Sequence, residues 1–274
     1  MSEQLSPQGN DLLKLCDAAA KAVADAVDEM TGTPASGQVV RMGADGTPTK
    51  KIDSAAENAV LETLRASGLG FLVLSEEVGE VSIGSNRSPD YFLHLDPLDG
   101  TFNAISGIPF YSVSIYLSKD DFHFGYICDL AQKTGFYAEA GRGAYSHTAG
   151  RLHVSSSSDL SIFSISAYTL RPHTARISGV GDVVRRIRTL GSSSLEMALV
   201  ASGKLDAFVD LRGMMRVVDI AAGKIILEEA GGMVTDERGN RLVLDGNMWQ
   251  KRDLIGSNGL RHTDLLKLIG GGRN

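Results

Sequence analysis

The strongest chemical signal in the sequence is a pair of closely spaced aspartates. Asp96 and Asp99 lie in the segment Asp-Pro-Leu-Asp-Gly-Thr, which directly follows the largely apolar run 91–95. Two ionised carboxylates this close repel each other, and burying either one is costly unless a positive charge compensates. A divalent cation supplies that charge, and Mg²⁺ prefers carboxylate oxygens and water as ligands. The segment therefore indicates a metal site, although an acidic turn in which Thr101 caps a helix also explains it.

Three further acidic positions follow a strand or begin a helix. Glu76 lies in a Ser-Glu-Glu segment after the apolar run 71–74, and Asp53 and Asp219 lie at the expected starts of two helices. Taken singly, each has an ordinary explanation, because an acid near a helix N-terminus is favoured by the helix dipole or acts as an N-cap. Taken together, acidic groups in four separate elements predict one multi-metal site.

Composition excludes several classes of protein. Acidic residues outnumber basic ones by 33 to 27, which gives a net charge of −6 and disfavours a nucleic-acid partner. No run approaches the roughly 18 apolar residues that a membrane span needs, and the N-terminal residues do not form a secretory signal. The two cysteines, Cys16 and Cys128, are far apart and indicate reduced thiols. We therefore expect a cytoplasmic protein with no membrane partner.

The pattern of elements predicts a mixed fold of the α+β or α/β class. Residues 1–150 are expected to form an N-terminal α+β half with most of the metal ligands, and residues 151–274 an α/β half that supplies Asp219 and substrate contacts. A loop without periodicity is expected over 31–49. The expected helices are 10–30, with Asn10 as the cap, 52–66, 179–186, 193–202, 219–230 and 262–269. The expected strands are 71–74, 91–95, 111–117, 122–128, 134–139, 163–166, 188–190, 207–211 and 254–257.

In order and spacing, these acidic motifs resemble the inositol monophosphatase family over nearly the whole chain. The segments 107–110 and 229–232 also match family patterns. The resemblance implies a layered αβαβα sandwich of the inositol monophosphatase/fructose-1,6-bisphosphatase type. The chain departs from most members at Val218, where they have Trp. Together with Arg212 and Arg216, the Arg-Val-Val-Asp form is similar to the archaeal branch, whose members act on inositol monophosphate and fructose 1,6-bisphosphate.

The resemblance implies a phosphatase that activates water with two or three Mg²⁺ ions per site, for which Mn²⁺ can substitute. It further implies a small phosphorylated sugar or polyol as substrate and a homodimer. The implied metal ligands are Glu76, Asp96, the Leu98 carbonyl, Asp99 and Asp219. The implied catalytic residues are Glu76, Thr101 and Asp53. The implied substrate contacts are Asp99, Gly100, Thr101, Arg188, Ser193 and Arg212.

Other readings of the same residues stay open. A phosphatase of 3′-phosphoadenosine nucleotides is the nearest alternative, although such relatives usually carry inserted segments. A non-catalytic regulatory protein on the same fold is a second, and a Ca²⁺-stabilised structural domain is a third. Calcium ligands usually gather within one loop, whereas here they spread from Asp53 to Asp219. Trp249 is assigned to packing.

Overall fold

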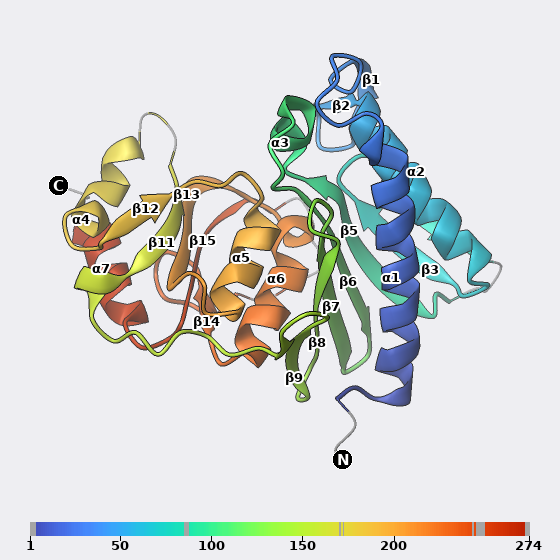
Figure 1. The fold of residues 1–274 in the computed structure, drawn as a ribbon. Helices are drawn as coiled ribbons and strands as arrows, with labels where there is room; N and C mark the ends of the chain where they lie inside the picture. The colour runs from blue at the N-terminus through green and yellow to red at the C-terminus, as the bar shows by residue number, and fades with distance from the viewer. Residues whose placement is uncertain are drawn as a thin grey trace.

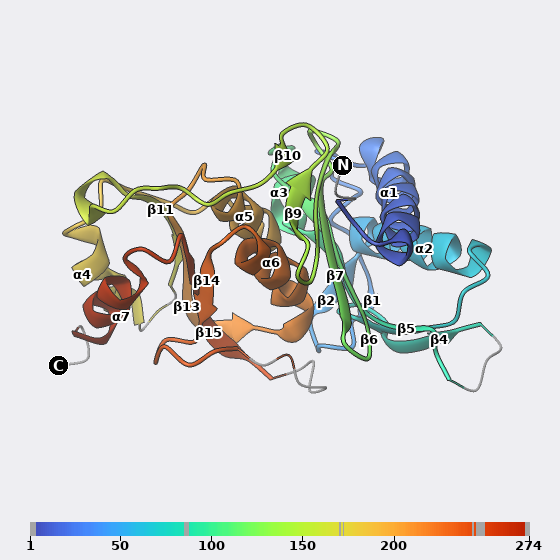
Figure 2. The ribbon, with the colours of Figure 1, turned by 90° about the horizontal axis from the view of Figure 1, so that it is seen from below.

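The computed structural model describes residues 4–84, 88–169, 171, 173–242, 244 and 250–271, so Trp249 lies outside the described residues. Five layers follow one another: two helices, a sheet, two helices, a second sheet and two helices (Figures 1 and 2). This is the layered αβαβα arrangement that the resemblance implies. No helix among the described residues is long and apolar enough to cross a membrane.

The first layer consists of α1 (Pro7–Asp28) and α2 (Lys51–Ala66), which pack on one face of the larger sheet. The buried residues of α1 recur at helical spacing and join the core beneath it. The helix begins before the expected cap, Asn10. Ser6 is the cap instead, accepting a hydrogen bond from the Gly9 amide at 2.9 Å, and Pro7 suits the first helical position because its missing N–H has no partner to lose there.

The larger sheet has eight strands in the order β10-β9-β8-β7-β6-β5-β3-β4. Of its neighbouring pairs, β3 and β5 run parallel, and the others are antiparallel. The strand β5 extends four residues beyond its expected end and so includes both aspartates of the central motif. The strands are β3 (Phe71–Ser75), β4 (Gly79–Ile83), β5 (Tyr91–Asp99), β6 (Ser112–Lys119), β7 (Phe122–Asp129), β8 (Thr134–Glu139), β9 (Gly143–Ser146) and β10 (Gly150–Arg151).

A small hairpin replaces part of the loop expected over 31–49. Its strands, β1 (Val39–Met42) and β2 (Pro48–Lys50), pair antiparallel. All four residues of β1 are exposed, so this strand has no alternation of buried and exposed positions that the sequence could reveal. The hairpin directly precedes α2 and carries Asp45 at its tip. A short helix, α3 (Thr101–Ser106), follows β5.

The middle layer consists of α5 (Ser193–Ala201) and α6 (Val217–Glu229), which lie between the two sheets (Figure 2). Both are buried nearly all round because each has a sheet on either side. The second sheet has the order β12-β11-β13-β15-β14, in which β11 runs parallel to both β12 and β13. Its strands are β11 (Ser164–Tyr168), β12 (Arg186–Arg188), β13 (Ala207–Met215), β14 (Met233–Thr235) and β15 (Arg252–Ser257).

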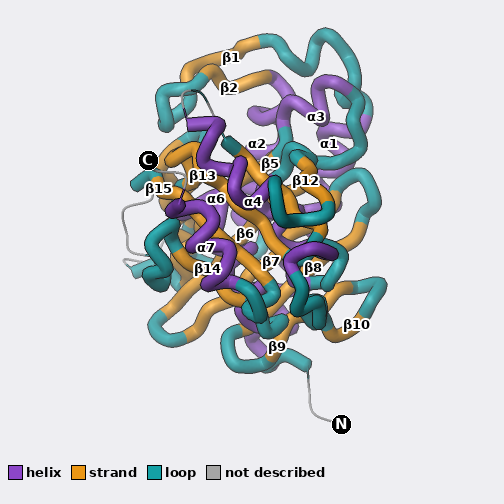
Figure 3. Tube along the Cα trace, turned by 90° about the vertical axis from the view of Figure 1, so that its left-hand side faces the viewer, coloured by secondary structure: helices purple, strands orange, loops and turns teal. Residues whose placement is uncertain are grey.

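The outer layer consists of α4 (Ser178–Gly181) and α7 (His262–Gly271), which face the viewer in Figure 3. The helix expected over 179–186 is much shorter in the structure, where it ends at Gly181. Its last expected residue, Arg186, is instead the first residue of β12. Two 3₁₀ turns, Leu160–Ile162 and His173–Ile177, flank β11. The chain passes from the first sheet to the second after β10. The expected division into an N-terminal half, 1–150, and a C-terminal half, 151–274, stays a prediction.

Candidate active site

The acidic motifs meet where two parallel strands end beside the first turn of a helix from the middle layer. The strands β3 and β5 are neighbours, so their carboxyl ends bring Glu76 and the aspartates of β5 to one edge. The N-terminus of α6 adds Asp219. These groups line a cavity of ≈ 270 Å³. The sequence-predicted residues that line it are Glu76, Asp96, Leu98, Asp99, Gly100, Thr101, Ser193, Arg212 and Asp219.

Three of the carboxylates form a compact cluster. One oxygen each from Glu76, Asp96 and Asp219 lies within 4.8 Å of the others. Burial, with the nearby carboxylates of Glu76, Asp99 and Asp219, raises the pKa of Asp96 well above its usual value. Burial likewise raises the pKa of Glu76 to about 8, against the opposing effect of Arg216. The cluster is thus short of positive charge, and a bound cation would relieve it.

Asp99 is fixed by the start of α5. Its Oδ2 accepts hydrogen bonds from the Ser194 amide at 2.7 Å and the Ser194 hydroxyl at 2.6 Å. The Ser192 hydroxyl donates a third, at 2.8 Å. Burial raises the pKa of Asp99, and these donors oppose that rise because they favour the ionised form. The carboxylate is therefore held in one orientation, with Oδ1 free of any hydrogen bond from the described residues.

A second arrangement joins α2 to α3. The Thr101 hydroxyl lies 2.8 Å from Asp53 Oδ1 and 3.1 Å from the Leu98 carbonyl oxygen, and it can donate to either. Asp53 also accepts from the Lys50 amide at 3.0 Å, as the third residue of α2, and burial raises its pKa. Asp53 does not itself line the cavity but orients Thr101, which does.

Arg216 and Asp45 are among the lining residues that were not predicted to act at the site. The Arg216 guanidinium lies 2.9 Å from Glu76 Oε1, 2.9 Å from Asp219 Oδ1 and 2.9 Å from Asp45 Oδ2. The sequence suggested that Asp219 is the N-cap of α6. Asp219 is instead the third residue of the helix, and its Oδ2 accepts a hydrogen bond from the Arg216 amide at 2.7 Å. Arg216 thus ties the tip of the hairpin to the acidic cluster.

The expected substrate contacts divide into two groups. Gly100, Ser193 and Arg212 line the cavity. Gly100, the N-cap residue of α3, has a φ of 96°, a left-handed conformation that favours glycine. Arg188, by contrast, is exposed on β12, an edge strand of the second sheet, and is absent from the cavity lining, so the structure does not bring it to the site. The basic residues among the described lining are Arg212, Arg216 and Lys251.

The residues at this cavity suit a hard divalent cation. Carboxylate oxygens and a backbone carbonyl are the ligand types that Mg²⁺ and Mn²⁺ accept, and no histidine or cysteine contributes to the described lining. Burial and the neighbouring carboxylates raise the pKa of Asp96 in spite of the opposing effect of Arg216, so one arginine does not balance the negative charge of this donor set.

Comparisons with known proteins agree on one family. A family model described as the inositol monophosphatase family matches residues 10–270. A fructose-1,6-bisphosphatase/inositol-1-monophosphatase from Methanothermobacter thermautotrophicus is 39% identical over 264 residues, which cover 91% of this chain and 93% of the relative. A bifunctional NADP phosphatase/NAD kinase from Methanococcus maripaludis is 36% identical over 281 residues, but these cover 95% of this chain and only 49% of that relative.

A solved structure supports the same assignment. A Pyrococcus horikoshii protein with similarities to inositol-1 monophosphatase superposes with a TM-score of 0.83 at 29% identity, covering 97% of this chain and 99% of its own. The fold and the phosphatase relatives define a phosphoric monoester hydrolase. The chain belongs to the inositol monophosphatase family.

Proposed function

We propose that this phosphatase is Mg²⁺-dependent and hydrolyses fructose 1,6-bisphosphate to fructose 6-phosphate and inositol 1-phosphate to myo-inositol. The observation that carries the proposal is the cluster of Glu76, Asp96 and Asp219, which shares one cavity with Thr101 and Arg212. The cluster offers ligands for cations, and Arg212 offers a positive charge beyond it. The names of the archaeal relatives support both substrates.

The proposed metal ligands are those expected from the sequence: Glu76, Asp96, the Leu98 carbonyl, Asp99 and Asp219. Two or three Mg²⁺ ions held there, or Mn²⁺ in their place, would lower the pKa of a bound water and offset the charge that develops on the phosphate. The chain supplies no side-chain nucleophile in this scheme, and a phosphoenzyme is not expected.

Thr101 and Asp53 are proposed to orient the attacking water. Because the Thr101 hydroxyl donates its single proton to Asp53 or to the Leu98 carbonyl, its lone pairs are left to accept a hydrogen bond from water. Glu76 is the second group proposed to accept a proton or hydrogen bond from that water. The amides of Gly100 and Thr101, at the start of α3, are proposed to hold the phosphate that reacts.

Arg212 is proposed to bind the second phosphate of a bisphosphate. A guanidinium is suited to phosphate because it is always charged and donates several hydrogen bonds in one plane. Ser193 and Asp99, which line the same cavity, are proposed to contact the sugar hydroxyls. Arg188 does not line the cavity, so Arg212 is the one expected substrate contact that brings a positive charge to the described lining.

A nucleotide phosphatase is the second candidate. The relative from Methanococcus maripaludis favours NADP as the substrate of that candidate, because the matched half of that bifunctional protein spans nearly all of this chain. The 3′-phosphoadenosine compounds are alternative substrates of the same class. A homodimer and a cytoplasmic location stay predictions.

The test is release of inorganic phosphate from fructose 1,6-bisphosphate, inositol 1-phosphate, NADP and 3′-phosphoadenosine 5′-phosphate, each with Mg²⁺ and with chelator. We expect the largest kcat/KM for the first two substrates and no release with chelator. A larger kcat/KM for NADP would replace the proposal with the nucleotide phosphatase. Release from none of the four would favour the non-catalytic reading.

A further inference from the structure

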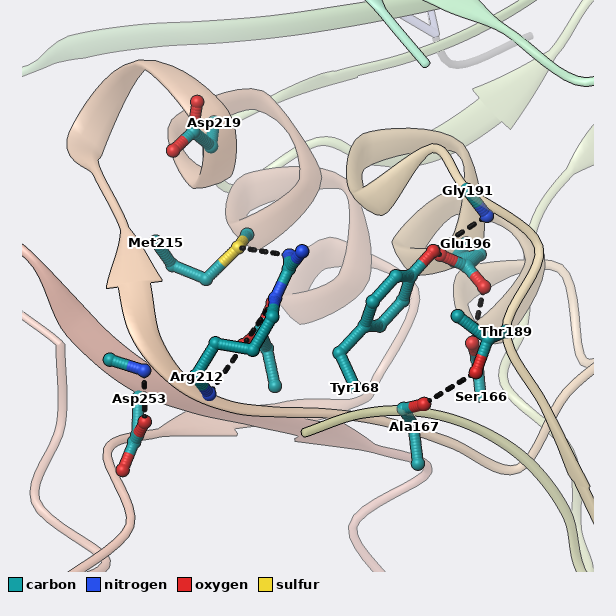
Figure 4. A network of polar contacts seen from close by, with 12 residues as sticks. Ser166, Ala167, Tyr168, Thr189, Gly191, Glu196, Arg212, Met215, Asp219 and Asp253 are labelled. Atoms are coloured by element: carbon teal, nitrogen blue, oxygen red, sulfur yellow. Dashed lines mark hydrogen bonds and ion pairs between the residues drawn. The ribbon is translucent and has the colours of Figure 1, made fainter. Parts of the chain in front are cut away.

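Arg212 is held on two sides before any substrate arrives. Its Nε and Nη2 donate to the buried Asp210 carboxylate, at 3.0 Å and 2.6 Å from Oδ2. Its guanidinium carbon lies 4.5 Å from the centroid of the Tyr168 ring. Figure 4 shows the side chain extended beside that ring. Nη1 donates no hydrogen bond to any described residue, so this nitrogen is available to an anion in the cavity.

The parallel register of two strands creates this arrangement. Tyr168 ends β11 and lies directly opposite Asp210 on β13. Arg212 follows Asp210 by two residues, so both side chains leave β13 on the same face. The Arg212 amide also donates to Asp210 Oδ1 at 2.9 Å, which fixes the backbone of the arginine as well as its side chain. The guanidinium has therefore lost most of its rotamer freedom in the protein alone.

The hydroxyl of Tyr168 has a separate set of partners. It accepts a hydrogen bond from the Gly191 amide at 2.6 Å and donates to the buried Glu196 carboxylate. Glu196 in turn accepts from the Leu190 amide at 2.8 Å. The segment held in this way leads directly into the serines that bind Asp99. The ring of Tyr168 thus contacts Arg212, whereas its hydroxyl holds the segment before α5 by hydrogen bonds.

We propose that Tyr168 is a positioning residue that determines specificity, because its ring holds the Arg212 guanidinium as a fixed receptor for the second phosphate of a bisphosphate substrate. The inference rests on the proposed function. An arginine on a long flexible stem must be ordered when phosphate binds, and that ordering weakens binding. The ring of Tyr168 and the carboxylate of Asp210 do this ordering in advance. A monophosphate, which has no second phosphate, gains nothing from it.

The experiment compares KM and kcat for fructose 1,6-bisphosphate and inositol 1-phosphate in the intact protein. Tyr168→Phe is the matched control, because it removes the hydroxyl and keeps the ring. Relative to that control, Tyr168→Leu removes only the ring and should raise KM for the bisphosphate about five- to tenfold, with KM for the monophosphate unchanged. If the leucine variant does not fold, Tyr168→Met replaces it.

A double-mutant cycle with Arg212→Gln shows whether Tyr168 acts through the arginine. We expect Arg212→Gln alone to raise KM for the bisphosphate, and Tyr168→Leu to add no further rise in that background. If Arg212→Gln raises KM but Tyr168→Leu does not, the role of Tyr168 is wrong and the proposed function stands. Equal effects of Tyr168→Leu on both substrates would also overturn it. If the wild-type protein releases no phosphate from the bisphosphate, both proposals fail.

Discussion

Removing the Arg216 guanidinium should destabilise the metal-free protein and strengthen Mg²⁺ binding. The side chain is 10% exposed and contacts carboxylates of Asp45, Glu76 and Asp219, each at 2.9 Å. Breaking a buried ion pair by removing one partner typically costs about 3–5 kcal/mol, because the remaining charge is left uncompensated. Each kcal/mol shifts Tm by roughly 2–4 °C in a chain of this size. Arg216→Met should therefore lower the Tm of the metal-free protein by about 10 °C.

Mg²⁺ should recover much of that loss. Arg216 and the cation are attracted to the same carboxylates and repel each other, so each weakens the binding of the other. We expect the variant to bind Mg²⁺ at least about tenfold more tightly than the wild type, which is a modest coupling free energy for two sites. Isothermal titration of the metal-free proteins measures the affinity, and thermal unfolding with and without saturating Mg²⁺ measures the recovery.

Arg176→Met is the matched control for this experiment. Arg176 pairs with Asp253 at 2.7 Å, and both side chains are similarly buried, but the pair does not line the cavity. It should lower Tm by the same amount with and without Mg²⁺. If Arg216→Met also lowers Tm by the same amount with and without Mg²⁺, the reasoning is refuted. Weaker Mg²⁺ binding than in the wild type would refute it as well, and would mean that Arg216 organises the carboxylates for the metal.

Two other substitutions test separate parts of the account. His94 is buried, neither ring nitrogen has a partner among the described residues, and burial lowers its pKa to about 4. The unfolded chain, with a pKa near 6.5, binds the proton first, so the wild type should lose about 3 kcal/mol as pH falls from 6.5 to 4. His94→Phe should flatten that slope in urea unfolding at several pH values, and an unchanged slope would contradict the assignment. Thr101→Val should lower kcat for phosphate release by at least about a hundredfold while the Mg²⁺ titration stays as in the wild type, because it removes the hydroxyl that orients water and keeps the shape of the side chain. A normal kcat would remove Thr101 from the mechanism.

The acidic cluster could be predicted from the sequence because each acid lies in a short motif. Neighbouring residues show whether that motif follows a strand or begins a helix. The strand before Asp96 and the helix after Asp219 are apolar runs that sequence patterns reveal. That the acids meet at one site was predicted from the four acidic elements taken together and from the family resemblance, but the pairing that brings them there, β3 parallel to β5, is a long-range contact that no local pattern reveals.

The residues that the sequence did not reveal are those whose role depends on long-range contacts. Arg216 and Asp45 are separated by 171 positions, and no local pattern joins them. Asp45 also lies in a hairpin with an exposed first strand, so neither its element nor its direction could be predicted. Tyr168 lies two residues beyond the end of the strand expected over 163–166, and its contact with Arg212 depends on the register of β11 with β13. Arg188 shows the opposite case: its type suits phosphate, but its edge strand leaves it outside the cavity.

The most direct test of the central claim is the Mg²⁺ dependence of phosphate release from fructose 1,6-bisphosphate, measured on chelator-treated wild type and on Asp99→Asn. The account predicts no release without metal, a rate that rises to saturation with Mg²⁺, and loss of nearly all of that rate in the variant, whose side chain keeps its shape but loses the charge held by Ser192 and Ser194. Release that persists in chelator, or a variant as active as the wild type, would contradict a metal-activated site at these carboxylates.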